Sequence, residues 1–197
     1  MSVPTAIIEC TSCDYQTIAL QTVGSFAWCD DFGNRAAMKR QLGVCTDCAG
    51  IVAMETIPEP RELQTILSNL STETEEDETP KKGWFSRLLG EPKDDRPDWL
   101  KVVHGMRDKN PAEVLKALAK QSRPPICLVC GSTRVKPFHL PAREELPETL
   151  EFVTDVEHPG CGGKFIAYFP KGRRYAPFEY ATLVHVAGEI VRRERYR

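Results

Sequence analysis

The apolar positions of this chain fall into short runs rich in β-branched and aromatic residues, which are separated by stretches with helical spacing. Clusters of Gly, Pro, Asn and Asp mark turns between the runs. Short runs of this kind bounded by turn residues predict strands. The predicted strands lie in both halves of the chain, at 5–9, 15–21, 51–57, 134–140, 150–156 and 164–169. The stretch 35–42 is ambiguous between a short helix and a strand.

Helical spacing appears in three places. The segment 59–70 places four apolar residues on one face. A helical hairpin is predicted over 98–123, where Asn110 followed by Pro111 has the pattern of an N-cap and first helical residue. The stretch 177–193 is predicted to form a C-terminal helix. The apolar faces are formed by Leu63, Ile66, Leu67 and Leu70 in the first segment and by Trp99, Leu100, Val103, Met106, Val114, Leu115 and Leu118 in the hairpin.

The segment 71–97 differs in composition from its surroundings. Its first ten residues are acidic and polar and contain no large apolar side chain, so a flexible linker is predicted. An apolar island follows, formed by Trp84, Phe85, Leu88 and Leu89. This island predicts a docking segment for a protein partner. Folding back onto the protein's own surface and weak contact with a membrane surface remain alternatives.

The cysteines supply the strongest chemical signal. Seven of the eight belong to three CxxC units and one HxxC unit. Thiolate and imidazole groups are preferred ligands of zinc, and a set of four of them closes the coordination shell of a structural ion. Pairing units that are neighbours in sequence predicts two zinc sites, one from Cys10, Cys13, Cys45 and Cys48, and one from Cys127, Cys130, His158 and Cys161.

Two further residues need a separate interpretation. His139 is a possible fourth ligand, but His158 is preferred because it reproduces the spacing of the other units and His139 lies within a predicted strand. Cys29 is the odd cysteine. It is interpreted as a small buried apolar residue beside Trp28, with a spare ligand or a reactive thiol as the alternative.

These units and their flanking strands resemble the zinc-ribbon superfamily, in which a metal clamps one end of paired hairpins. The resemblance implies a small α+β fold of two zinc-ribbon β units with accessory helices, joined by a partly disordered linker. Such ribbons bind proteins, bind nucleic acids, or are purely structural. The implied divisions are an N-terminal ribbon with a trailing helix (1–70), the linker (71–97), the helical hairpin (98–123) and a C-terminal ribbon with the C-terminal helix (124–197).

Charge and hydropathy restrict the function classes. The 197 residues carry a formal net charge of −2, which provides no overall field that would attract nucleic acid. The longest apolar runs are too short to cross a bilayer. The first residues show neither a basic region nor an apolar region of a secretion signal. Metal-bound, reduced thiols and a cytoplasmic location are therefore expected.

No arrangement of nucleophile, base and acid can be assembled from the sequence, so an enzyme is not expected. The leading hypothesis is a non-enzymatic, zinc-binding adaptor that binds a protein partner. A nucleic-acid-binding protein is the first alternative, and a thiol redox sensor is the second. The basic residues that would contact nucleic acid are Lys171, Arg173, Arg174, Arg192 and Arg193.

Overall fold

The computed structural model describes the backbone of residues 2–3, 6–76, 110–140, 151–170, 174–175 and 180–195. Within these ranges the chain forms two helices, α1 (Pro60–Glu76) and α3 (Pro111–Lys120). The strands are β1 (Ser2–Val3), β2 (Ile7–Cys10), β3 (Gln16–Ile18), β4 (Ser25–Cys29), β5 (Arg35–Ala37), β6 (Arg40–Cys45), β7 (Gly50–Glu55), β8 (Val135–Pro137), β9 (Phe152–Glu157), β10 (Lys164–Tyr168), β11 (Arg174–Tyr175), β12 (Tyr180–His185) and β13 (Ile190–Arg195).

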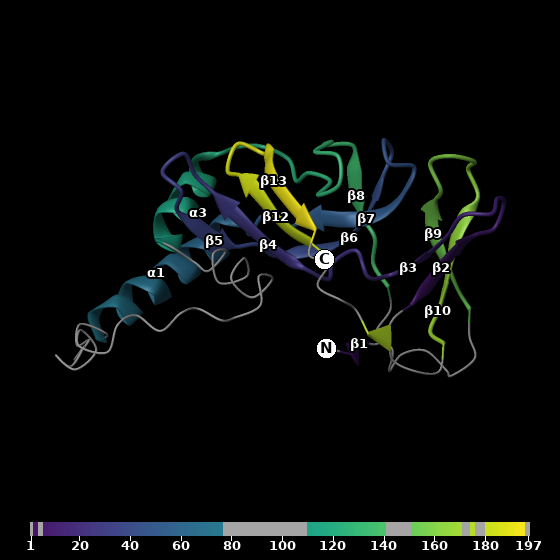
Figure 1. Cartoon of the computed structure of the whole chain (residues 1–197), viewed down its shortest axis with the longest axis horizontal. Coiled ribbons are helices and arrows are strands. Elements are labelled where there is room, and N and C mark those ends of the chain that lie inside the picture. The colour runs from purple at the N-terminus through teal and green to yellow at the C-terminus, as the bar shows by residue number, and fades with distance from the viewer. Residues whose placement is uncertain are drawn as a thin grey trace.

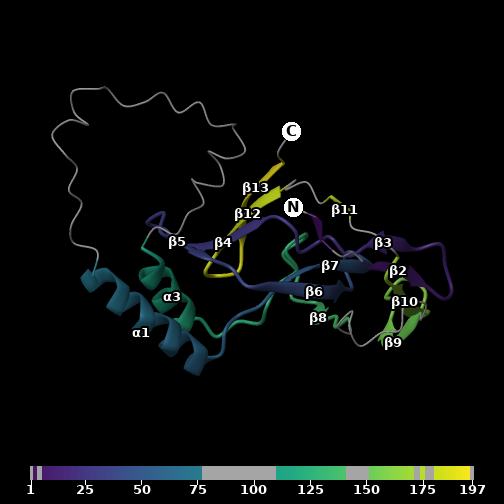
Figure 2. The same ribbon diagram turned by 90° about the horizontal axis from the view of Figure 1, so that it is seen from below.

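The strands form four sheets, with the orders β3-β2-β10-β9, β7-β6-β8, β13-β12-β4-β5 and β1-β11. Figure 1 shows the three larger sheets spread along the long axis of the molecule, with α1 and α3 at one end and the β9 sheet at the other. The two helices lie side by side (Figure 2) and contact each other directly. The result is a small, mostly β, α+β protein.

Each of the three larger sheets contains strands from both the 1–70 and the 124–197 stretches. β2 pairs antiparallel with β10, β6 with β8, and β4 pairs parallel with β12. The two stretches are therefore interleaved, and they do not form the separate ribbons that pairing of sequence neighbours predicts. Buried apolar faces explain this, because Ile8 of β2 and Phe165 of β10 bury their side chains completely in one shared cluster.

Several predicted elements are confirmed. The helix over 59–70 is found in α1, and the helix that begins after Asn110 is α3, with Val114, Leu115 and Leu118 buried. The ambiguous stretch 35–42 forms β5 and the start of β6. Pro137 lies in β8 at a sheet edge, where its missing N–H does no harm. Helix α1 continues to Glu76, into the predicted linker.

The predicted C-terminal helix over 177–193 is wrong. β12 and β13 form a hairpin there, joined by a turn in which Gly188 has a φ of 97°. Its N–H donates to the His185 carbonyl over 2.8 Å. Apolar residues with helical spacing suggested the helix, but the chain is rich in β-branched residues and Gly188 interrupts it, and both features favour a hairpin.

A buried cluster connects the helices to the sheets. It includes Trp28 from β4, Leu63 from α1, Leu118 from α3 and Leu128 from the loop before β8, all at most 3% exposed. A second cluster joins the sheets of β2 and β6 and contains Ile8, Val44, Ile51, Phe138, Phe165 and Ala167. Buried apolar clusters therefore connect the three larger sheets within the described residues, and displacement of one of these sheets disturbs the next.

A buried ion pair crosses the first of these clusters. Glu55 at the end of β7 is fully buried, and both of its carboxylate oxygens accept hydrogen bonds from the Arg123 guanidinium, over 2.6 and 2.7 Å. The Trp28 indole N–H and the Ile126 backbone N–H also donate to this carboxylate. Arg123 in addition donates to the Val186 carbonyl over 2.7 Å. The network ties four chain segments together.

Among the described residues no helix is long and apolar enough to cross a membrane. The apolar island of Trp84, Phe85, Leu88 and Leu89 and the first half of the predicted helical hairpin lie outside the described residues, as do Lys171 and Arg173. For Arg174 and Arg193 only the backbone is described, in β11 and β13, whereas Arg192 has an exposed side chain.

Candidate metal centres

The eight ligand candidates gather in two groups of four. In each group the potential ligand atoms all lie within 4.8 Å of one another. The outer centre consists of Cys10, Cys13, His158 and Cys161, and the inner centre consists of Cys45, Cys48, Cys127 and Cys130. Each centre therefore takes one pair from the N-terminal half of the chain and one from the C-terminal half.

This pairing corrects the sequence prediction. The pattern identified all eight residues but assigned Cys10 and Cys13 to Cys45 and Cys48, which are their neighbours in sequence. Strand pairing decides otherwise, because β2 ends at Cys10 and pairs with β10, which begins shortly after Cys161. β6 ends at Cys45 and pairs with β8, which follows Cys130. The two centres are nested, with the inner pairs lying between the outer pairs in sequence.

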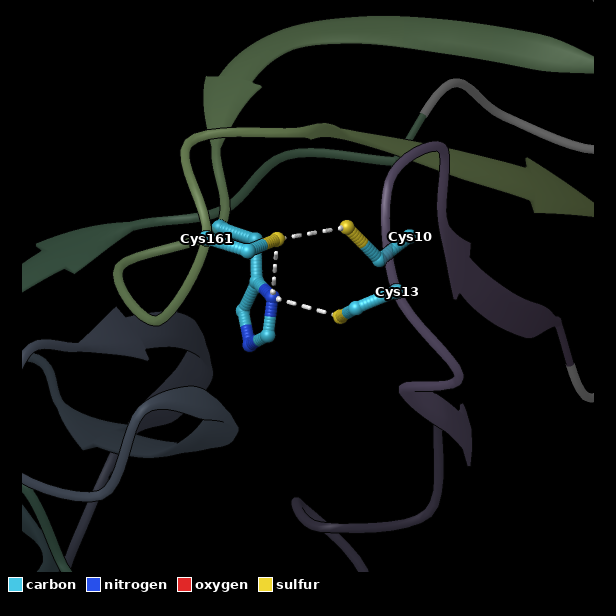
Figure 3. A group of neighbouring side chains, drawn as sticks. Cys10, Cys13 and Cys161 are labelled. Atoms are coloured by element: carbon cyan, nitrogen blue, oxygen red, sulfur yellow. Dashed lines mark hydrogen bonds between the residues drawn. The ribbon is translucent and has the colours of Figure 1, made fainter.

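In the outer centre the side chains converge from two loops. Figure 3 shows the sulfur atoms of Cys10 and Cys13 facing the loop that carries Cys161. The Sγ atoms of Cys10 and Cys161 are 3.3 Å apart, and the Nδ1 atom of His158 lies 3.3 Å from the Sγ atoms of both Cys13 and Cys161. His158 is the histidine of this centre, as the sequence favoured, whereas His139 is exposed and belongs to neither group.

In the inner centre the Sγ–Sγ distances are 3.7 Å between Cys45 and Cys130 and 3.8 Å between Cys48 and Cys127. A tetrahedral zinc ion with Zn–S bonds of about 2.3 Å separates its sulfur ligands by about 3.8 Å. The inner centre therefore has the dimensions of a zinc tetrahedron. Cys45 and Cys127 are fully buried, whereas Cys48 is half-buried and Cys130 is exposed, so the inner centre lies at the edge of the buried core.

The loops that carry the ligands share a backbone feature. The residue after the second ligand has a positive φ in three of the four units, at Ala49 (48°), Gly131 (78°) and Gly162 (74°). This left-handed residue turns the chain back after the ligand pair, and glycine adopts it without strain. Ala49 adopts the same conformation despite its Cβ atom, at a cost of about 1–2 kcal/mol.

Neighbouring thiols, backbone N–H groups and burial shift the pKa values of two cysteines in the outer centre. Burial raises the pKa of Cys10, but hydrogen bonds from the Ser12 N–H and from the thiols of Cys161 and Cys13 outweigh it and lower this pKa to about 6. The Gly163 N–H lowers the pKa of Cys161. The hydrogen bond between the thiols of Cys161 and Cys10, together with burial, outweighs this effect and raises the pKa of Cys161 to about 11. Near pH 7 the centre thus offers a thiolate at Cys10.

The inner centre shows the same division. Burial and the neighbouring sulfurs raise the pKa of Cys48, and burial raises the pKa of Cys127 to about 11. Burial also acts on Cys130, but the Ser132 N–H and the neighbouring thiols lower its pKa. Because thiolates are the ligands, a metal ion that enters must displace protons from the remaining thiols.

In the outer centre the backbone of Gly163 lies close to the loop that carries Cys10. A Cβ atom placed there would lie 2.6 Å from the Ser12 hydroxyl and 2.7 Å from the Cys10 sulfur. We expect Gly163→Ala to displace Cys10 and to lower the bound metal from two ions to one, as counted by native mass spectrometry. Gly160→Ala is the matched control, because its Cβ would meet only the His158 ring at 3.4 Å. Two ions in both variants would contradict the expectation.

Cys29 lies outside both centres. It is 7% exposed and packs with Ala27 and Leu183, and burial raises the pKa of its thiol. Within the described part of the chain it takes part in neither group of metal-ligand candidates, so the interpretation as a small buried apolar residue fits its surroundings.

Comparison with known proteins gives no relative from which a role could be transferred, because no family model, no curated protein and no solved structure matches the chain.

Proposed function

We propose that this chain is a non-enzymatic zinc protein in which two structural ions hold a β scaffold that binds a protein partner. The observation that carries the proposal is the closed donor set of each centre. The outer centre offers three thiols and one imidazole, and the inner centre offers four thiols. Zinc is the common divalent ion that is typically bound by such a set of four donors.

A structural role for both ions follows from the number of donors. Catalytic zinc sites keep a position open for water or substrate, whereas four protein ligands complete the tetrahedron. In both centres four side chains already converge on one point. An ion held in this way would stabilise the pairing of strands that are distant in sequence. It would have no open position at which to activate water or a substrate.

Two features support partner binding. The sequence places Trp84, Phe85, Leu88 and Leu89 close together in an otherwise polar segment. In the described part of the chain, Phe32 is 88% exposed at the tip of the β4–β5 hairpin. The Asp30 carboxylate holds this tip by accepting hydrogen bonds from the N–H groups of Phe32 and Asn34, over 3.0 and 2.9 Å. An exposed aromatic side chain on a turn held by hydrogen bonds can serve as an anchor at an interface.

The test compares variants of the zinc-loaded, full-length chain in partner capture from cells that express it. Trp84→Ala combined with Phe85→Ala is expected to weaken binding of the captured partner roughly 30-fold or more, the effect of losing an interface hot spot. Ser86→Ala is the matched control within the same segment, and it should bind like the unaltered protein. Capture of the same partner at equal affinity by all three proteins would refute a docking role for the segment.

The alternatives gain no specific support. The nucleic-acid hypothesis uses the basic residues at 171–174 and in the C-terminal tail, and residues 190–195 of that tail form β13. Of the basic residues predicted to contact nucleic acid, only Arg192 has a described side chain. The redox hypothesis needs the same thiols that the two centres use as metal ligands. Both hypotheses stay predictions.

A further inference from the structure

The two metal centres share a contact that neither needs for its own ligand set. His158, a ligand of the outer centre, directs its second ring nitrogen, Nε2, to the Ala49 carbonyl over 2.9 Å. Ala49 follows Cys48, a ligand of the inner centre. In the opposite direction, the Ile51 N–H donates over 2.8 Å to the hydroxyl of Tyr15, which lies two residues after Cys13.

The His158 contact determines how this ring can bind metal. A carbonyl oxygen only accepts hydrogen bonds, so the proton of the neutral ring lies on Nε2 and the lone pair lies on Nδ1. Nδ1 is the atom 3.3 Å from the sulfurs of Cys13 and Cys161. Partners of this kind fix the tautomer and orientation of a metal-bound histidine, and their loss commonly weakens metal binding 10–100-fold.

The position of the accepting carbonyl depends on the inner centre. Ala49 has a φ of 48°, a conformation that a residue with a Cβ atom adopts only when its surroundings enforce it. The neighbouring constraint is Cys48, whose sulfur is held at the inner centre. We therefore expect the carbonyl to be well oriented when the inner centre holds an ion and poorly oriented when Cys48 is released.

Tyr15 forms the reciprocal contact. Its ring packs against the His158 ring with a centroid distance of 4.7 Å. The same ring lies so close to Gly50 that a Cβ atom on this glycine would be 2.7 Å from a Tyr15 ring carbon. Tyr15 therefore lies between a ligand of the outer centre and the first residues of β7, which leave the inner centre.

The surrounding packing leaves little room for independent movement. Ile51 continues from this contact into the cluster of Ile8, Val44, Phe138 and Phe165, which joins the two sheets that carry the centres. Ile8 and Phe165 are fully buried there. Because a close-packed interior resists displacement, a shift in one ligand loop is passed to the other.

From these contacts we propose that the two centres bind metal cooperatively, with coupling through the Ala49–His158 and Ile51–Tyr15 hydrogen bonds. The inference rests on the proposed binding of an ion at both centres. Coupling between two sites is reciprocal, so an ion at either centre raises the affinity of the other by the same factor. Given the effect of comparable histidine partners, we expect a factor of about 10–100.

The test uses cadmium-113 as the probe, because its NMR resonance separates a site of four sulfurs from a site of three sulfurs and one nitrogen. The reduced, full-length protein is titrated with buffered cadmium, and the filling midpoint of each centre is read from its own resonance. Ala49→Val is expected to move the outer midpoint at least tenfold toward weaker binding, since a β-branched residue resists a positive φ. Ala49→Gly is the matched control, because glycine keeps this conformation, and its midpoints should stay unchanged.

Tyr15→Phe tests the other direction and changes no residue of the inner loop. It removes the hydroxyl that accepts from the Ile51 N–H while keeping the ring, so it should weaken the inner centre by a similar factor. Unchanged midpoints in Ala49→Val or in Tyr15→Phe would overturn the coupling, while two filled centres would still support the proposed function. Failure of the unaltered protein to fill two centres would instead refute the proposed function itself.

Discussion

Removal of both metal ions will unfold the β core of this protein, and the loss will extend beyond the two ligand loops. Structural zinc sites contribute apparent binding free energies on the order of 10–16 kcal/mol that are coupled to folding. A whole domain is typically stable by only about 5–15 kcal/mol. Each centre joins loops from opposite halves of the chain, and Cys45 and Cys127 of the inner centre are fully buried.

The measurement is the tryptophan emission and far-ultraviolet circular dichroism of reduced protein during chelation. Trp28 is 1% exposed and reports on the core, and replacing Trp84 and Trp99 with Phe makes it the sole indole. We expect its emission to shift to longer wavelength as metal leaves and to recover when zinc is returned. The same chelator already saturated with zinc serves as the control. A metal-free protein that keeps its strand signal and a buried Trp28 would show that the core is stable without the ions.

The ligand candidates could be predicted from the sequence because the spacing within each pair is a local property. Two ligands three positions apart can face one point in any short turn, whatever the rest of the chain does. The partner of each pair is not a local property. Cys10 and Cys13 meet His158 and Cys161 because β2 pairs with β10, and that choice depends on side chains such as Ile8 and Phe165 in a shared core.

The length of the loop between two ligand pairs does not determine which pairs meet in one centre. Pairing Cys13 with Cys45 closes a loop of roughly 30 residues, whereas pairing it with His158 closes roughly 140, which costs only about 1.4 kcal/mol more in chain entropy. Burial of apolar strand faces contributes about 25 cal/mol per Å² and easily exceeds this difference. Proximity in sequence is therefore a weak guide to which pairs of ligand candidates meet in one centre.

The C-terminal hairpin shows a different limit. The apolar spacing of residues 177–193 predicts a helix, and the structure has two strands there instead. The parallel pairing of β12 with β4 explains the difference, because Val184 becomes fully buried there opposite Trp28. This contact joins residues far apart in sequence, and periodicity within one segment does not report it.

The largest effect of a single side chain outside the metal centres is expected at Arg123. In Arg123→Ala the Glu55 carboxylate would remain buried with its negative charge unpaired. Breaking a buried ion pair by removing one partner typically costs about 3–5 kcal/mol. The residue also donates to the Val186 carbonyl, so the β12–β13 turn would lose a contact to the core. We expect a fall of this size in the free energy of unfolding of the zinc-loaded protein, measured by urea denaturation.

Two further variants separate charge from packing. Arg123→Met combined with Glu55→Gln removes both charges while keeping similar volumes, and we expect it to regain part of the stability lost in Arg123→Ala. Glu62→Ala is the surface control. It removes an exposed ion pair with Lys39 and should change stability by less than about 1 kcal/mol. If Arg123→Ala were no more destabilising than Glu62→Ala, the buried Glu55 carboxylate would not depend on Arg123 for compensation of its charge. The ion pair would then not be what joins β7 to the segment around Arg123, and the apolar cluster around Trp28 and Leu128 would hold these parts together alone.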